Sequence, residues 1–156
     1  MAKTEKKTAE KSTEQATERA FIIKQIFIKK NALNVKTAPF ELKKEWNPDA
    51  SLNLDVHSKA LDNDHYNVDL TIDINVKIDN IEVFTIQVTQ SGIFEMSGYT
   101  AEQIDQLKNS FCANILFPYA RQIVSSTTSQ AGFPPLIMAP VDFDGRYQQL
   151  KSQQSK

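Results

Sequence analysis

The spacing of hydrophobic residues first predicts a sheet. From Tyr66 to Ile78, apolar residues alternate strictly with polar ones, which is the period of a strand with one buried and one solvated face. Shorter alternations predict two more strands at Ser51–His57 and Ile81–Thr89. Asp79-Asn80 fits a turn between the last two strands. These short connections indicate an antiparallel meander.

A further strand precedes the meander, and a helix follows it. In the segment Phe21–Ile28, one face could hold Phe21, Ile23 and Phe27, and the other Ile22, Ile26 and Ile28. Apolar residues on both faces predict a strand that is covered, at least partly, on both sides. Thr100 and Gln103 fit a capping box, and apolar residues then recur at helical spacing as far as Ile123. Pro118 lies inside this run and is expected to kink or split the helix.

The second half of the chain completes an α+β fold. Gly132 supplies a stop for the long helix, and a short last helix can start after Asp142. A chain of 156 residues fits one domain and tails. We expect a disordered N-terminal tail at 1–19, which has no large apolar residue, one domain at 20–150 and a C-terminal tail at 151–156.

Composition and charge narrow the possible partners. The formal net charge is −1, so no overall field favours nucleic acid or an anionic membrane. The N-terminus has no apolar core of signal-peptide length, and no apolar run is long enough to cross a bilayer. Cys112 is the single cysteine, which excludes an internal disulfide. A cytoplasmic protein that does not insert directly into a membrane is the default expectation.

Residues that usually carry chemistry are few and scattered. His57 and His65 fall on solvated strand faces, with no metal-ligand spacing around them. Cys112 lies in the apolar helix, where a buried structural thiol is favoured over a nucleophile. Asp69 and Asp73 share the wet face of one strand, where solubility is the commoner role for acids. The sequence therefore predicts no enzyme, no metal site and no cofactor.

Two irregular segments hold unusual amounts of apolar surface. Phe40, Leu42 and Trp46 lie in one of them, and residues 133–138 lie in the other. Together they could wall a groove for extended peptide. The alternative is that both segments simply cap the core, which is the commoner role of buried aromatics. One long helix is too small to bury the apolar face of four strands, so we also expect contacts with another subunit.

Three stretches form longer motifs: QSGIF at 90–94, CANILFPYAR at 112–121 and GFPPLIMAPVDFDGRY at 132–147. They resemble the SecB family of protein-export chaperones, in which these motifs read close to QxGIF, CPxILFPYAR and FPxLxLAPVxFDxLY. Weaker matches extend the resemblance from Phe21 to Leu150. The spacing of the second and third motifs makes the resemblance specific.

The resemblance implies a four-stranded antiparallel sheet with a crossover loop after the first strand. It also implies a homotetramer, built as a dimer of dimers. The family holds unfolded preproteins without ATP hydrolysis and delivers them to the SecA translocation motor. A client-binding groove is mapped by the resemblance to Phe27, Phe40, Trp46, Phe84, Phe133, Phe143 and Tyr147. Tetramer contacts are mapped to Ile86, Val88 and Gln90.

The surface that would face SecA departs from the family pattern. It maps to Lys30, Lys36, Asp55, Asp69, Asp73, Thr85 and Gln87. Acids are usual near Lys30 and at Lys36, and a Leu and a Glu are usual at Thr85 and Gln87. These changes remove negative charge where a positive partner would dock, although the three aspartates can partly compensate. The C-terminal KSQQSK is basic, whereas the family's tail is usually acidic.

Two rival interpretations remain. In the first, the chain is a SecB-like paralogue uncoupled from SecA, which acts as a general chaperone or serves a toxin–antitoxin pair. In the second, it is an enzyme on a helix-backed antiparallel sheet, such as a thioesterase-like fold. That enzyme would need a carboxylate or histidine at the apolar start of the helix, where only Asp105 is found.

Overall fold

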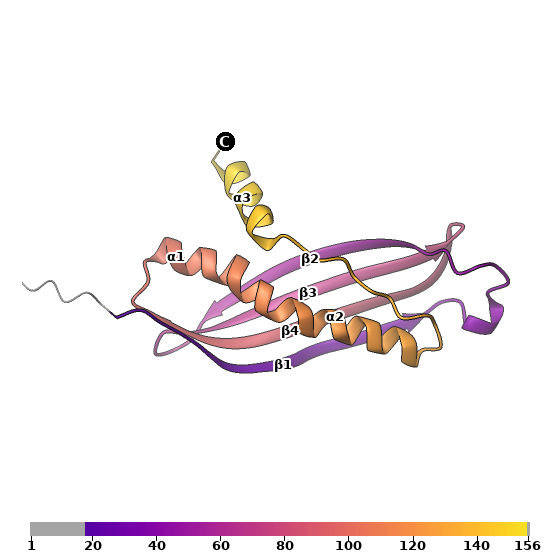
Figure 1. Cartoon of the computed structure of the whole chain (residues 1–156), viewed down its shortest axis with the longest axis horizontal. Helices are drawn as coiled ribbons and strands as arrows, with labels where there is room; N and C mark the ends of the chain where they lie inside the picture. Colours follow the sequence, from indigo (N-terminus) through magenta and orange to yellow (C-terminus); the bar gives the residue numbers. More distant parts are fainter. Residues whose placement is uncertain (1–17, 156) are drawn as a thin grey trace, which may run out of the picture.

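A computed structural model describes residues 18–155 and confirms the α+β fold (Figure 1). The strands are β1 (Ala20–Val35), β2 (Asp49–Ala60), β3 (His65–Ile78) and β4 (Ile81–Ser97). The helices are α1 (Ala101–Gln106), α2 (Cys112–Gln130) and α3 (Phe143–Gln154). A 3-10 turn spans Pro39–Glu41, and a π turn at Leu107–Phe111 joins α1 to α2.

The strands form one antiparallel sheet in the order β1-β4-β3-β2. β1 pairs with β4 rather than with β2, so the first connecting segment, residues 36–48, crosses over to the far edge of the sheet. Asp79 and Asn80 both have positive φ, at 48° and 66°. A tight turn with φ > 0 at both central residues is typical of a two-residue hairpin. The predicted crossover and meander are confirmed.

The two faces of the sheet differ sharply. α1, the π turn and α2 lie across one face (Figure 1). Even-numbered residues of β3, and of β4 from Phe84 onwards, point to that helix-covered face, and Val68, Leu70, Ile72, Val76 and Val88 are each 0% exposed. Odd-numbered residues such as Thr71, Asp73 and Gln87 point to the other side, which we call the open face. Strict alternation therefore predicted both the strand and its buried side.

Close approach of α2 to the sheet depends on Gly92. A Cβ atom built on Gly92 would lie 2.6 Å from Phe94 Cε2 and 3.1 Å from Leu116 Cδ2. Leu116 is fully buried on the inner face of α2. A larger residue at 92 would push the Phe94 ring or the helix away from the sheet, so the glycine is required by packing.

The faces of β1 differ from the sequence interpretation, which placed Phe21, Ile23 and Phe27 together. The register with β4 shifts between Ile23 and Gln25 and again between Ile28 and Lys30. Phe21 and Ile23 lie opposite Met96 and Phe94 on the helix-covered face. Phe27 lies opposite Ser91, on the open face. Each bulge adds a residue and reverses the alternation.

One long helix follows the sheet, as predicted, and α2 continues through Pro118 without splitting. A π-helical segment, Leu107–Phe111, precedes α2 within this helix. The cap formed by Thr100 and Gln103 is confirmed. Gly132 follows the end of α2 with φ +89°, as a helix stop requires.

Only part of the predicted tails is described. Residues 1–17 lie outside the described range, and Glu18 and Arg19 precede β1 without regular structure. α3 continues to Gln154, four residues beyond the predicted boundary at 150. Lys151 in its last turn pairs with Glu102 of α1 at 3.0 Å, which supports the extension.

The three residues mapped to tetramer contacts lie beneath the helices. Ile86, Val88 and Gln90 are 2%, 0% and 2% exposed within a single chain. Since they are already covered, they have almost no area left for a second copy of the chain. Any effect of these residues on assembly would act through the position of α2.

Val88→Asp should lower the free energy of unfolding by several kcal/mol, because it buries a carboxylate without a partner. Sedimentation is expected to show dimers or unfolded material, and urea titration should show an earlier midpoint. Gln149→Glu is the matched control, since it adds the same charge at an exposed position of α3. A Val88→Asp protein as stable and as large as the control would contradict this packing.

Candidate functional site

The two irregular segments meet at an aromatic stack. The second connecting segment, residues 131–142, places Phe133 5.7 Å from Trp46 and 4.9 Å from Phe84, measured between ring centroids. Trp46 belongs to the first connecting segment, and Phe84 to the start of β4. Gly132 also lies against Pro39. The predicted convergence of two apolar segments is therefore present, but Phe84 and Phe133 are 0% and 4% exposed.

Beside the stack, β2 and the second connecting segment enclose an apolar hollow of about 260 Å³. It is lined by Ala50, Leu52, Ile74, Leu136, Ile137, Met138, Ala139, Pro140 and Val141. Leu52 is 44% exposed and Ile137 is 77% exposed. α2 covers β3 and β4 but leaves this part of β2 uncovered (Figure 1). The result is a concave apolar surface open to solvent.

The first connecting segment adds a second apolar surface. Phe40, on the 3-10 turn, is 88% exposed. The turn is held by the Ala38 N–H, which donates to the Glu41 carboxylate at 2.7 Å. A hollow of about 220 Å³ lies nearby, with Leu42, Ile78 and Ile81 in its lining. An aromatic ring so exposed on a fixed turn marks a contact surface for another molecule.

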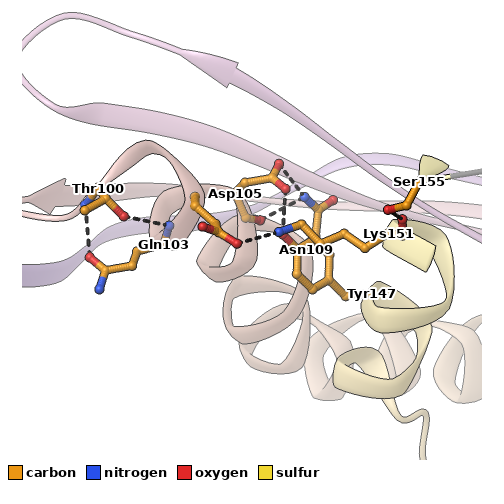
Figure 2. Close-up of polar contacts among 8 residues, drawn as sticks. Thr100, Gln103, Asp105, Asn109, Tyr147, Lys151 and Ser155 are labelled. Atoms are coloured by element: carbon orange, nitrogen blue, oxygen red, sulfur yellow. Dashed lines mark hydrogen bonds and ion pairs between the residues drawn. The ribbon is translucent and has the colours of Figure 1, made fainter. Parts of the chain in front are cut away.

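Phe143 and Tyr147 anchor α3 instead of lining an open groove. Phe143 is 1% exposed and packs edge-on against Phe117 at 5.7 Å. Figure 2 shows Tyr147 turned towards α1, where its hydroxyl donates to Asp105 Oδ2 at 2.7 Å. Burial, together with this hydrogen bond, raises the pKa of the Tyr147 hydroxyl.

The mapped groove residues therefore fall into separate groups. Trp46 is half-buried and Phe40 is exposed, whereas Phe84, Phe133, Phe143 and Tyr147 belong to the core and Phe27 lies on the open face. Leu52 was predicted only as a strand residue, and Ile137 only as one of the apolar residues at 133–138 that could wall the groove. Ile137 stands between Pro135 and Pro140 in a segment barred from helix, which is the signal that could have identified it.

The residues mapped to the SecA-facing surface gather on the open face, except Lys36. Register places Asp55, Asp69, Asp73, Thr85, Gln87 and Lys30 on that face. Lys36 lies just beyond the end of β1, where its N–H bonds to the Val83 carbonyl. The mapping is thus spatially coherent.

The charges on that face are partly offset within the chain. Lys29 Nζ lies 2.7 Å from Asp69 Oδ2, and Lys24 lies 2.8 Å from Glu95. Asp55 lies 2.8 Å from His57 Nε2. Asp69 is therefore already partnered and offers little net charge to another protein, so less compensation remains than the sequence suggested.

The structure offers little for catalysis in the described residues. Burial raises the pKa of the Cys112 thiol to about 12, which keeps it protonated and unreactive near neutral pH. Between residues 18 and 155, no group of His, Cys, Asp and Glu side chains could hold a metal ion. None of the helices in that range is both long and apolar enough to cross a bilayer.

Comparison with known proteins agrees with the architecture. The SecB family, described as preprotein translocase subunit SecB, matches residues 14–154. Protein-export protein SecB 2 of Francisella tularensis subsp. novicida is 39% identical over 133 residues, covering 85% of this chain and 90% of that protein. Protein-export protein SecB of Neisseria meningitidis is 40% identical over 130 residues, covering 83% and 88%.

A solved structure shows the same fold at lower identity. It is a SecB-like chaperone of Mycobacterium tuberculosis in complex with a ChAD peptide from the HigA1 antitoxin. The TM-score is 0.68 at 19% identity, with 78% of this chain and 90% of that chain covered. The family match and the two close relatives, together with the sheet, the helix and the exposed apolar segments, show that the chain belongs to the SecB family of protein-export chaperones, which are not enzymes.

Proposed function

We propose that the chain holds unfolded preproteins, without ATP, on the apolar surface formed by the two connecting segments. The observation that carries this proposal is the exposure of Phe40 and Ile137, at 88% and 77%, beside two apolar hollows. An unfolded segment could cover these side chains with its own apolar residues. Since burial of apolar area is non-directional, such contacts tolerate many client sequences. We place this activity in the cytoplasm.

We also propose the homotetramer, built as a dimer of dimers. β1 is an edge strand of 16 residues, and its Ile22, Ile23 and Ile28 are 44%, 46% and 55% exposed. On the outer side of the long helix, Phe111 and Tyr119 are 49% and 50% exposed. A long apolar edge and an apolar outer helix surface both favour contacts with further copies of the chain.

We further propose that the chain delivers preproteins to SecA, and we expect its affinity for SecA to be low. The open face has Thr85 and Gln87 where the family pattern has an apolar anchor and an acid, and Lys30 lies on the same face. Asp69 is occupied by Lys29. Among the described residues, Asp55 and Asp73 are then the mapped carboxylates left without a lysine or arginine partner, so a basic partner surface would find less negative charge than the family pattern offers.

The same observations favour the alternative, a SecB-like paralogue uncoupled from SecA. Such a protein would keep the apolar client surface and lose the docking face. It could act as a general chaperone or serve a toxin–antitoxin pair, as the complex with an antitoxin peptide suggests for the Mycobacterium tuberculosis protein. A direct SecA titration separates the two proposals.

Trp46 is the single tryptophan and is half-buried against Phe133. Binding of an unfolded preprotein should cover its remaining exposed surface and shift or quench its fluorescence. The titration is read by emission spectra, with the same preprotein in its folded state as control. If a saturating unfolded client changes neither the wavelength nor the intensity of the emission, Trp46 only packs in the core and does not contact the client.

The double variant Phe40→Ser, Ile137→Ser should weaken client binding about a hundredfold or more, since two fully buried apolar side chains contribute about 3–6 kcal/mol, at about 1.4 kcal/mol per factor of ten. Both side chains are exposed, so the urea midpoint should hardly change. Leu150→Ser is the control, because Leu150 is 43% exposed but lies on α3. Equal client affinity for the double variant and the control would disprove the proposed surface.

The triple variant Lys36→Glu, Thr85→Leu, Gln87→Glu should bind SecA more tightly than the natural chain. Exposed charge pairs contribute roughly 0.2–1 kcal/mol each. Several pairs and a restored anchor together should yield roughly one to two powers of ten, at about 1.4 kcal/mol per factor of ten. Calorimetric titration of SecA measures the gain, which should shrink as salt rises because exposed charges are screened.

The control for the triple variant is the double variant Lys43→Glu, Gln148→Glu. It makes the same change in net charge at exposed residues away from the open face. It should leave SecA affinity unchanged. Tight SecA binding by the natural chain, or a triple variant no better than this control, would show that another surface docks SecA.

A further inference from the structure

Arg146 departs from the family motif at a position beside the proposed client surface. The family motif reads FDxLY, whereas this chain has FDGRY at 143–147, so an arginine replaces a leucine. Arg146 lies in the first turn of α3, shortly after residues 136–141, which line the apolar hollow on β2 (Figure 1). A charged side chain therefore stands where the family pattern has an apolar one.

The guanidinium of Arg146 is held at β2, an edge strand of the sheet. Its Nη2 atom donates to the Leu54 carbonyl at 2.6 Å. Leu54 and Leu52 are two residues apart on β2, which is about 7 Å along a strand, and both belong to the helix-covered face. Because Leu52 lines the hollow, the guanidinium lies about one such step from the apolar surface.

Arg146 is half-buried and has no carboxylate partner within residues 18–155. In that range its side chain makes the one hydrogen bond to Leu54, although a guanidinium has five N–H donors. The acids in this turn have other partners, since Asp142 accepts from the Gly145 N–H at 3.0 Å and Asp144 accepts from the Ser110 hydroxyl. A partly desolvated cation with spare donors favours a carboxylate brought by another molecule.

From this geometry we infer that Arg146 selects unfolded segments that carry an acidic residue next to an apolar one on the same face. The apolar side chain enters the hollow between Leu52 and Ile137, and the aspartate or glutamate pairs with Arg146. In an extended segment, side chains two residues apart share a face and lie about 7 Å apart, which matches the step from Leu52 to Leu54. No charged residue lines the hollow itself, so the charge preference comes from Arg146.

The inference deepens the proposed function and rests on it, because it assumes that clients bind at this apolar surface. It adds a class of client, since burial of apolar area alone does not distinguish acidic, neutral and basic neighbours. The alternative is that Arg146 only ties α3 to β2. That role would affect the binding of all clients equally, whereas pairing with a carboxylate would affect acidic clients alone.

Fluorescein-labelled peptides test the inference with the full-length chain. Each is unstructured and has leucine at every second position except the central one, which is Glu, Gln or Lys. Anisotropy titration should show that the Glu peptide binds about fivefold more tightly than the Gln peptide, and that the Lys peptide binds more weakly than both. Moving the Glu by one residue, to the other face of the extended peptide, should remove its advantage.

Variants assign the preference to Arg146, and the readout is the ratio of the Glu-peptide and Gln-peptide affinities. Arg146→Gln should bind both peptides equally. Arg146→Lys retains a cation and should retain a preference for the Glu peptide. Lys59→Gln is the matched control, since it removes the same charge at an exposed position of β2, and it should keep the full preference. Higher salt should reduce the ratio for the natural chain, because the pair remains partly exposed.

The possible failures are distinguishable. Equal binding of the Glu and Gln peptides to the natural chain would overturn the inference and leave the client surface intact. An Arg146→Gln protein that binds both peptides more weakly but keeps their ratio would show that Arg146 only anchors α3. If none of the peptides binds the natural chain, the client surface is refuted, and this inference with it.

Discussion

The packing of α2 against the even-numbered rows of β3 and β4 is the contact on which the remaining structure depends. Leu116 reaches the sheet at Gly92, and the apolar residues of both strands are removed from water along its length. Each such side chain contributes about 1.5–3 kcal/mol when fully buried. Because one helix covers mainly β4 and β3, the apolar residues of β2 are left to the second connecting segment. The apolar hollow is thus a consequence of how the core is filled.

The two faces of the sheet consequently suit different kinds of partner. The helix-covered side offers apolar area at Leu52 and Ile137, where recognition requires only burial and tolerates varied sequences. The open face offers hydrogen-bonding groups at fixed cross-strand spacing, where recognition requires matching donors. The proposed client surface and the proposed docking face would therefore make different demands on their partners.

Local periodicity predicted the elements well, but it could not predict packing between them. The alternation in β3, the cap at Thr100 and the stop at Gly132 are local signals, and all three are present. The faces of β1 could not be predicted, because its two bulges are set by pairing with the distant β4. Phe84 and Phe133 were placed in an open groove, yet their burial depends on where two segments meet. The π turn has no recognisable local signal.

Exposed apolar side chains persist here because the backbone that carries them is bonded independently of their burial. Glu41 accepts from the Ala38 N–H across the turn that presents Phe40, and Thr128 Oγ1 accepts from the Leu136 N–H next to Ile137. Pro135 and Pro140 further restrict the second segment. These backbone hydrogen bonds form without burial of the apolar side chains in either segment. The proposed client surface is therefore already arranged before binding, and less conformational entropy would be lost when a client binds.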